Sequence, residues 1–321
     1  MDKKFLTLFL MLLLGSGLFA QVQKSLDTFK SSEFYRFFNY SHKSETPQGR
    51  IFQPGALQEY FQLLVEAPNN LITQMTLKIN STLYKQKPEF EVLALDMWKS
   101  FILLNAPEKE AAIKELFENY STKKTLRDYY AEHLAQFFRG KIPFFAFPLQ
   151  SGSIYFQRNG TEIIACATSK KEVKPLTKPV NFLSDNFVRT LEPTLVPTVN
   201  QTNGNIRAWN SDKPQAKIDR IVHIAYEFSD KNSALSYLVQ DFEEFTEGGI
   251  IETPSTQNKL PSADLLLFVN MNNNPLANAL GMEMNMLSLI ILKDKKLHKI
   301  FISGNSQVTF NDLILLGEKV Q

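Results

Sequence analysis

The chain has 321 residues, of which 44% are hydrophobic and 21% charged, and its formal net charge is +2. This composition is ordinary for a globular protein and excludes an intrinsically disordered chain. Because the charge is nearly neutral, no general attraction to nucleic acid or anionic membranes is expected, and we predict no nucleic-acid partner. The length allows one large domain or two medium-sized ones.

The first 20 residues have the parts of a cleavable signal peptide in the expected order. Lys3 and Lys4 give a positive start, Phe5 to Leu14 is almost wholly apolar, and Ala20 offers a small residue before a cut. Leu18 departs from the pattern, because a second small residue is preferred there. We predict cleavage after Ala20. A retained anchor helix is the alternative, but the apolar stretch is about half of the ~20 residues that span a bilayer.

The residues after this segment bear on how the exported chain would be held. A bacterial lipid anchor needs a cysteine at the new N-terminus, where this chain has Gln21. The longest later apolar runs, Leu265–Val269 and Leu289–Leu292, have the length of strands. We therefore expect no membrane span in the mature chain, which would be a soluble periplasmic or secreted protein. Cys166 is the only cysteine, so no internal disulfide can form and the core must stabilise the fold.

Residues 21–141 are predicted to form an all-helical domain. Apolar residues recur at steps of three to five residues, which is typical of one buried helical face. The expected helices lie within 26–38, 55–66, 89–105, 107–117 and 125–138. Leu71 to Gln86 fits a helix or a strand, because Met75, Leu77 and Ile79 also alternate; we prefer the helix. Alternate helices begin about 35 residues apart, so a helical-repeat solenoid is an alternative to a bundle.

Residues 142–216 are predicted to form a β-hairpin followed by a Pro-rich connector. Two β-rich runs, 154–157 and 162–168, flank Asn159-Gly160, a dipeptide that favours the positive φ angles of a tight hairpin turn. Residues 173–216 carry five prolines and contain one short expected helix at Phe182–Leu191.

Residues 217–321 are predicted to form an α+β domain with a mixed sheet. Strands are expected at 218–228, 265–270, 287–292 and 297–302. Asp230 and Thr309 can each cap a following helix, the second of which ends the chain. The whole chain is thus expected to be α+β, with a helical N-terminal domain, a hairpin with its connector, and a C-terminal mixed-sheet domain.

Metal and nucleophile patterns are absent from the sequence. The four histidines, His42, His133, His223 and His298, do not occur at ligand spacing, and one cysteine cannot build a thiolate cage. A zinc site assembled from distant residues stays open. Cys166 with a histidine could act as nucleophile and base, but its apolar strand context favours a buried inert thiol. Phosphate-binding glycine loops are missing, so no cofactor is predicted.

Several weaker candidates have a structural explanation beside the functional one. Ser151 and Ser153 flank a glycine and fit a turn. His223 falls in mid-strand, on the face of Glu227, and fits a half-exposed strand residue. An acidic cluster at Asp241, Glu243, Glu244 and Glu247 and basic clusters at Lys170, Lys171, Lys174 and at Lys293, Lys295, Lys296, Lys299 fit solvated faces.

Two aromatic stretches and one loop could instead serve binding. Phe34 to Tyr40 contains five aromatic residues in seven, and Ile142 to Phe147 contains three Phe; both fit core packing, or an exposed patch for a partner. The loop Asn270–Met286 is rich in Asn and Met. Because no catalytic group is visible, we predict a non-catalytic protein that binds a partner or small ligand. The alternative is an exported hydrolase whose site is assembled from distant residues. No site residue and no oligomeric state is predicted.

Overall fold

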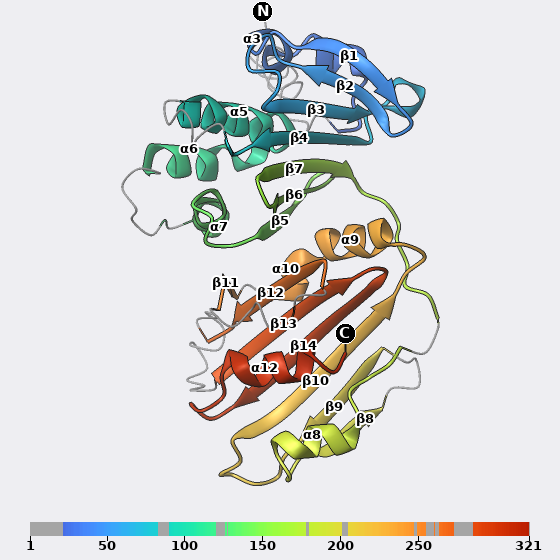
Figure 1. The fold of residues 1–321 in the computed structure, drawn as a ribbon, viewed down its shortest axis with the longest axis vertical. Coiled ribbons are helices and arrows are strands. Elements are labelled where there is room, and N and C mark those ends of the chain that lie inside the picture. Colours follow the sequence, from blue (N-terminus) through green and yellow to red (C-terminus); the bar gives the residue numbers. More distant parts are fainter. Residues whose placement is uncertain are drawn as a thin grey trace, which may run out of the picture. The chain divides into compact units, whose positions relative to one another are not determined.

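The computed structural model describes residues 22–82, 90–119, 126, 128–177, 180–200, 205–246, 249–254, 260, 263–272 and 285–320. The chain divides into two compact units, residues 1–171 and 172–321 (Figure 1). Each unit contains a seven-stranded sheet in which every pair of neighbouring strands is antiparallel. The signal-peptide prediction falls on residues outside the described part.

The first unit is built on a sheet with the order β1-β2-β3-β4-β7-β6-β5. Its strands are β1 (Ser41–Thr46), β2 (Gly49–Gln53), β3 (Phe61–Glu66), β4 (Gln74–Asn80), β5 (Phe144–Leu149), β6 (Gly152–Asn159) and β7 (Glu162–Ser169). The last strand of the first meander, β4, pairs with the last strand of the second, β7. This long-range pair joins the two halves of the unit into one sheet.

The prediction of an all-helical N-terminal domain is therefore wrong, since β1–β4 lie within it. Phe61, Leu63 and Val65 alternate with half-buried residues along β3, and the stripe of Leu57, Tyr60, Phe61 and Leu64 only imitated a helical face. In β4, the strand alternative for Met75, Leu77 and Ile79 is the correct one. Pairing with β3 and β7 on both sides outweighs the weak helical spacing of these short segments.

The helices predicted later in the first unit are confirmed. They are α5 (Phe90–Asn105), α6 (Glu110–Asn119), which follows a short 3₁₀ turn at Pro107–Lys109, and α7 (Tyr129–Phe138). Before β1 lie two short helices, α2 (Leu26–Lys30) and α3 (Glu33–Phe37). The predicted hairpin is also confirmed, but its turn lies one residue later than predicted: Asn159 pairs with Glu162, and the turn residues are Gly160, which has a φ of 59°, and Thr161.

Aromatic rings fill the core of the first unit. Phe137 from α7 and Phe145, Phe147 and Phe156 from the sheet are fully buried. The Phe156 ring lies 5.7 Å from the Phe137 ring and 6.1 Å from the Phe147 ring, centroid to centroid. Such contacts add to the area that each ring buries. The run Ile142–Phe147 is thus largely strand β5, with its three Phe in the core.

The second unit has the sheet order β11-β12-β13-β14-β10-β9-β8. Its strands are β8 (Val196–Asn200), β9 (Ile206–Asn210), β10 (Ile218–Glu227), β11 (Ile250–Glu252), β12 (Leu265–Asn270), β13 (Asn285–Lys293) and β14 (Lys296–Gly304). The mixed sheet that we predicted is wrong, because all pairs are antiparallel. Strands β8 and β9 arise from the segment predicted as an irregular connector.

Helices cover both faces of the second sheet. These are α8 (Asp185–Leu191), α9 (Lys231–Gln240), α10 (Phe242–Thr246) and α12 (Phe310–Gly317). Leu313 and Leu316 of α12 belong to an aliphatic core with Ile300 of β14. Tyr237 of α9 contacts the ring of Tyr226 on β10. Tyr226 lies on the face of the sheet opposite to the one that α12 covers. Asp230 caps α9 and a Thr309–Asp312 capping box begins α12, so both predicted caps are confirmed.

Candidate functional site

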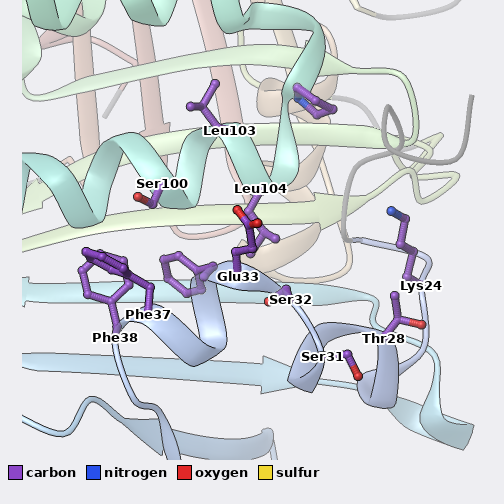
Figure 2. A pocket seen from close by; sticks show the side chains of 12 residues that line it. Lys24, Thr28, Ser31, Ser32, Glu33, Phe37, Phe38, Ser100, Leu103 and Leu104 are labelled. Atoms are coloured by element: carbon purple, nitrogen blue, oxygen red, sulfur yellow. The ribbon is translucent and has the colours of Figure 1, made fainter. Parts of the chain in front are cut away.

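A groove of about 670 Å³ lies between α2–α3 and α5 in the first unit (Figure 2). Phe37 and Phe38 form its aromatic end (Figure 2), and Phe34 and Leu104 also line it. Phe34 and Phe38 are buried, whereas Phe37 is 78% exposed. An exposed Phe beside buried ones extends the apolar surface out to solvent, which is typical of a binding surface. We call this feature the α3–α5 groove.

Hydroxyl and charged groups line the other parts of the α3–α5 groove. They are Lys24, Thr28, Ser31, Ser32, Glu33 and Ser100. In Figure 2, Lys24 and Thr28 lie at the end away from Phe37 and Phe38, while Glu33 lies between. Lys24 and Glu33 form no ion pair within the described part of the chain. The groove is therefore apolar at one end and polar, with an available ammonium group, at the other.

The local sequence explains why these helices hold this shape. Ser25 and Ser32 cap α2 and α3, each accepting a hydrogen bond from a backbone N–H in the first turn, at 3.1 and 3.2 Å. The Phe34 ring packs on Phe101 of α5, with centroids 6.2 Å apart. Ser32 thus both caps α3 and lines the groove. The groove is thus built on capped helices that are anchored in the core.

A second groove of about 530 Å³ runs along the other flank of α5, toward α6. Its apolar residues include Val92, Leu95 and Phe117, and Val92 is 65% exposed. Leu103 lines both grooves. Charged residues of both signs also line the second groove: Asp96, Lys99, Glu110, Lys114 and Glu118. Val92, Asp96, Lys99 and Leu103 on the outward side of α5 therefore form one wall of this second groove.

A third pocket, also of about 530 Å³, lies at the β1–β2 hairpin and is mainly polar. Burial raises the pKa of its Glu66 carboxyl, and the charge of Lys171 counteracts this shift. The Gln74 amide donates to Glu66 at 2.8 Å, and Arg50 is ion-paired with Glu45 at 3.1 Å. The pocket lining contains no histidine, cysteine or serine that could act with Glu66 as a nucleophile or base.

The structure brings two of the four histidines together. His223 Nε2 lies 3.1 Å from His298 Nδ1, and the backbone N–H of Leu183 donates to His223 Nδ1 at 3.2 Å. Because Nδ1 of His223 accepts this hydrogen bond, the proton of the neutral ring lies on Nε2, which donates it to His298 Nδ1. Burial lowers the pKa of His223 to about 3 and that of His298 to about 4, with further lowering from the neighbouring His298 and Lys296 charges respectively.

This histidine pair is part of the core rather than of a cleft. His223 is fully buried and His298 is 3% exposed. The expectation that His223 is half-exposed is wrong, because α8 and the Leu183 segment cover that face of β10. Glu227 lies at the end of β10 and forms an ion pair with Lys295 at 2.8 Å. Within the described ranges, no carboxylate joins the two imidazoles, and no group of three potential metal ligands occurs.

The other two histidines lie apart from them and from each other in the first unit's fold. His42 is exposed on β1, with its ring 5.8 Å from that of Phe52. His133 is buried and stacks on Phe145, with ring centroids 5.0 Å apart. Its Nδ1 lies 2.9 Å from the Tyr129 carbonyl oxygen, and burial lowers its pKa. His133 is thus packed in the core, whereas His42 lies on the surface.

The cysteine and serine candidates are also explained by packing. Cys166 is fully buried, as predicted, and burial raises the pKa of its thiol to about 11. A thiol with this pKa is not a nucleophile at neutral pH. Gly152 lies where a side chain would collide with the carbonyl oxygen of Thr168. Ser151 and Ser153 therefore flank a glycine that the strand pairing requires, and Ser153 is itself buried in β6.

Several residues of the predicted charged clusters are ion-paired or buried. Lys295 pairs with Glu227, and Lys174 pairs with Glu172 at 2.5 Å. Lys299 is buried and approaches the Glu244 carbonyl oxygen at 3.5 Å, so it does not contribute to a basic surface. Glu247 and most of the loop 270–286 lie outside the described residues. In Phe34–Tyr40, core packing is confirmed for Phe34, Phe38 and Tyr40, which are buried, whereas Phe37 is exposed.

No protein-family model, no curated protein and no solved structure matches the chain. Among the described helices, none is both long enough and apolar enough to cross a membrane. The site must therefore be interpreted from its own residues.

The contact between α3 and α5 was not predicted from the sequence. It joins residues more than 60 positions apart and depends on the β1–β4 meander between them.

Proposed function

We propose that the mature chain is an exported, non-catalytic binding protein, and that it takes an amphiphilic ligand into the α3–α5 groove. The observation that carries this proposal is the exposed Phe37 ring beside an apolar floor, with Lys24 at the opposite end. An apolar pocket with a few polar groups is typical of ligand-binding sites. The apolar part of the ligand would contact Phe37 and Phe38, and its anionic or hydrogen-bond-accepting end would meet Lys24.

The arrangement of titratable groups supports binding rather than catalysis. The groove lining contains one carboxylate, Glu33, and neither histidine nor cysteine. General acid–base catalysis needs paired groups with contrasting environments. The buried histidine pair lies in the other unit and donates and accepts within the core. No observation on the described residues favours the hydrolase alternative, so we do not carry it forward.

A fluorescent amphiphile tests this proposal directly. We would titrate 8-anilinonaphthalene-1-sulfonate, which combines aromatic rings with an anionic group, into the folded chain. Phe37→Asp should weaken binding about tenfold or more, since burial of a Phe contributes about 1.5–3 kcal/mol. Lys24→Glu should weaken it by a smaller factor. The matched controls are Val196→Asp, at a half-exposed apolar position of the second unit, and Lys174→Glu. Equal effects of Phe37→Asp and Val196→Asp would refute the groove as the site.

Export is proposed separately and has its own test. The signal-peptide pattern of residues 1–20 motivates it. Mass spectrometry of the periplasmic or secreted fraction should find the N-terminal peptide beginning at Gln21. A peptide that begins at Met1 in that fraction would contradict cleavage.

A further inference from the structure

The outward face of α5 carries four residues in a single stripe. Val92, Asp96, Lys99 and Leu103 are spaced by four, three and four residues, so at 100° per residue they lie within about 60° of one another. Val92 and Asp96 are exposed, and Lys99 and Leu103 are partly exposed. The opposite side of α5 is buried through Met97, Trp98, Phe101 and Ile102. Spacings of four and three are those of the a and d positions of a coiled-coil seam.

The charges in this stripe have no ion-pair partner of their own. Asp96 and Lys99 form no salt bridge within the described part of the chain, although the Lys99 ammonium lies 5.9 Å from the Phe117 ring. Each is flanked by an apolar residue, Val92 before and Leu103 after. Among the described residues, the stripe thus presents an exposed and a partly exposed apolar side chain and two charges without an ion-pair partner, which a complementary surface would cover and neutralise.

We propose that this stripe pairs with the same stripe of a second copy of the chain, in an antiparallel arrangement about a twofold axis. The stripe is self-complementary in that orientation. Val92 of one copy faces Leu103 of the other, and Asp96 faces Lys99, with each contact occurring twice. A twofold interface requires this reciprocity. In a parallel pairing, Asp96 would face Asp96 and Lys99 would face Lys99, so like charges exclude it.

The surface beside the stripe, on the α6 side of α5, offers further contacts for a second copy. The 16-residue helix is about 24 Å long. A stable interface buries about 800 Å² on each partner, which is more than one helix ridge provides. The groove toward α6, which the stripe residues line together with Phe117, can accept side chains of the second copy.

This inference goes beyond the proposed ligand binding and does not depend on it. Leu103 is the one stripe residue that also lines the α3–α5 groove. Ser100 and Leu104, on the α3 side of α5, face the groove instead. The residues used to test ligand binding, Lys24 and Phe37, lie outside the stripe. The two proposals can therefore fail separately.

Sedimentation analysis with charge-reversed variants tests the dimer. The wild-type chain should be dimeric at micromolar concentration. Asp96→Lys and Lys99→Asp should each raise the dimer dissociation constant by about 100-fold or more, because each creates two like-charge contacts per interface. The double variant Asp96→Lys/Lys99→Asp should return to within about threefold of wild type. An equimolar mixture of the two single variants should form a heterodimer.

The controls are Asp212→Lys and Lys213→Asp, which reverse charges at exposed positions of the second unit and should leave the dimer unchanged. Circular dichroism establishes that each variant is folded. A wild-type chain that stays monomeric up to about 100 µM overturns the inference. A dimer that the single reversals do not weaken, or a double variant that stays monomeric, overturns it as well.

Discussion

The two units of this chain share one strand plan but fill it with different side chains. In each unit a meander is followed by helices and a second meander, and the last strands of the two meanders pair, β4 with β7 and β10 with β14. The first core is built largely from stacked Phe rings, the second largely from Leu, Ile and Val. This strand order therefore depends on the alternation of buried and exposed residues and on strand pairing, and not on whether the core is aromatic or aliphatic.

The helices show the more informative difference. In the second unit, α12 and α9 cover opposite faces of the sheet, and their apolar residues are buried except for Leu315 of α12, which is 44% exposed. In the first unit, α3 and α5 leave Phe37 and Val92 exposed beside two grooves. Among the described residues, the first unit thus has the more exposed apolar side chains, Phe37 at 78% and Val92 at 65%. We place the proposed ligand site in the first unit for this reason.

Acid should produce the largest difference between the two units in their free energy of unfolding. The pKa values of His223 and His298 are lowered in the folded chain from about 6.5, so the stability that their neutral forms contribute is present above pH 6.5 and is lost as the pH falls toward 4 and 3. At about pH 4.5 the loss should be on the order of 5 kcal/mol, at 1.36 kcal/mol for each pH unit and site.

The two tryptophans make this measurement possible in the intact chain, because Trp98 lies in the first unit and Trp209 in the second. Urea unfolding followed in a Trp98→Phe background reports the second unit, and in a Trp209→Phe background the first. Replacement of His298 by Asn should flatten the pH dependence of the second unit, whereas His42→Asn, at an exposed site, should not. Equal acid sensitivity of the two reporters would contradict the role of the pair.

Core truncation should act on one unit at a time. Phe156→Ala removes a ring that contacts Phe137 and Phe147, and should lower the free energy of unfolding of the first unit by about 3–5 kcal/mol. Ile300→Ala should lower that of the second unit by about 2–5 kcal/mol. Each substitution should shift only the Trp reporter of its own unit. If both reporters shift together, the chain unfolds as one cooperative body and the comparison of independent units is wrong.

Helix caps offer a matched pair with smaller effects. Asp128 accepts hydrogen bonds from two backbone N–H groups at the start of α7, and Asp312 accepts one at the start of α12 and pairs with Lys217. Replacement of either by Ala should cost about 1–2 kcal/mol in its own unit. Asp312→Asn retains an oxygen acceptor and should cost less than Asp312→Ala. An Asp312→Ala effect on the Trp98 reporter would argue against this assignment.

The hairpin turns should give the smallest effects, with opposite signs. Gly160 and Asp294 occupy equivalent turns, β6–β7 and β13–β14, with φ angles of 59° and 52°. Gly160→Ala should destabilise the first unit by about 1 kcal/mol, since only the backbone conformation opposes the added methyl group. Asp294→Gly should be neutral or slightly stabilising in the second unit. Thermal unfolding of both variants checks the pair, and a destabilisation by Asp294→Gly would show that its side chain matters more than its φ angle.

Elements with strong local signals were predictable from the sequence. Helix α5, the β6–β7 hairpin, and the caps at Asp230 and Thr309 depend on neighbouring residues, and each was found in the predicted segment, with the hairpin turn displaced by one residue to Gly160-Thr161. Strands β1–β4 were not predictable in the same way. Met75, Leu77 and Ile79 fit two periodicities, and only pairing with β7, about 90 residues away, decides between them.

In the candidate site, too, local features were predictable from the sequence and features that depend on distant contacts were not. The density of aromatic residues in Phe34–Tyr40 indicated a core or a patch, but which rings face outward depends on the contact of Phe34 with Phe101. The pairing of His223 with His298 likewise requires the register of β10 with β14. Properties that depend on one segment could be predicted from the sequence, whereas those that depend on strand register could not.

The most direct test of the binding proposal is to map the bound probe on the folded chain. Amide correlation spectra of the ¹⁵N-labelled protein would be recorded during titration with 8-anilinonaphthalene-1-sulfonate. We expect saturable shifts at residues of α2, α3 and the C-terminal half of α5, with Lys24 and Phe37 among them, and none in the sheet of the second unit. Shifts centred on the second unit, or spread over both units without saturation, would contradict a ligand site in the α3–α5 groove.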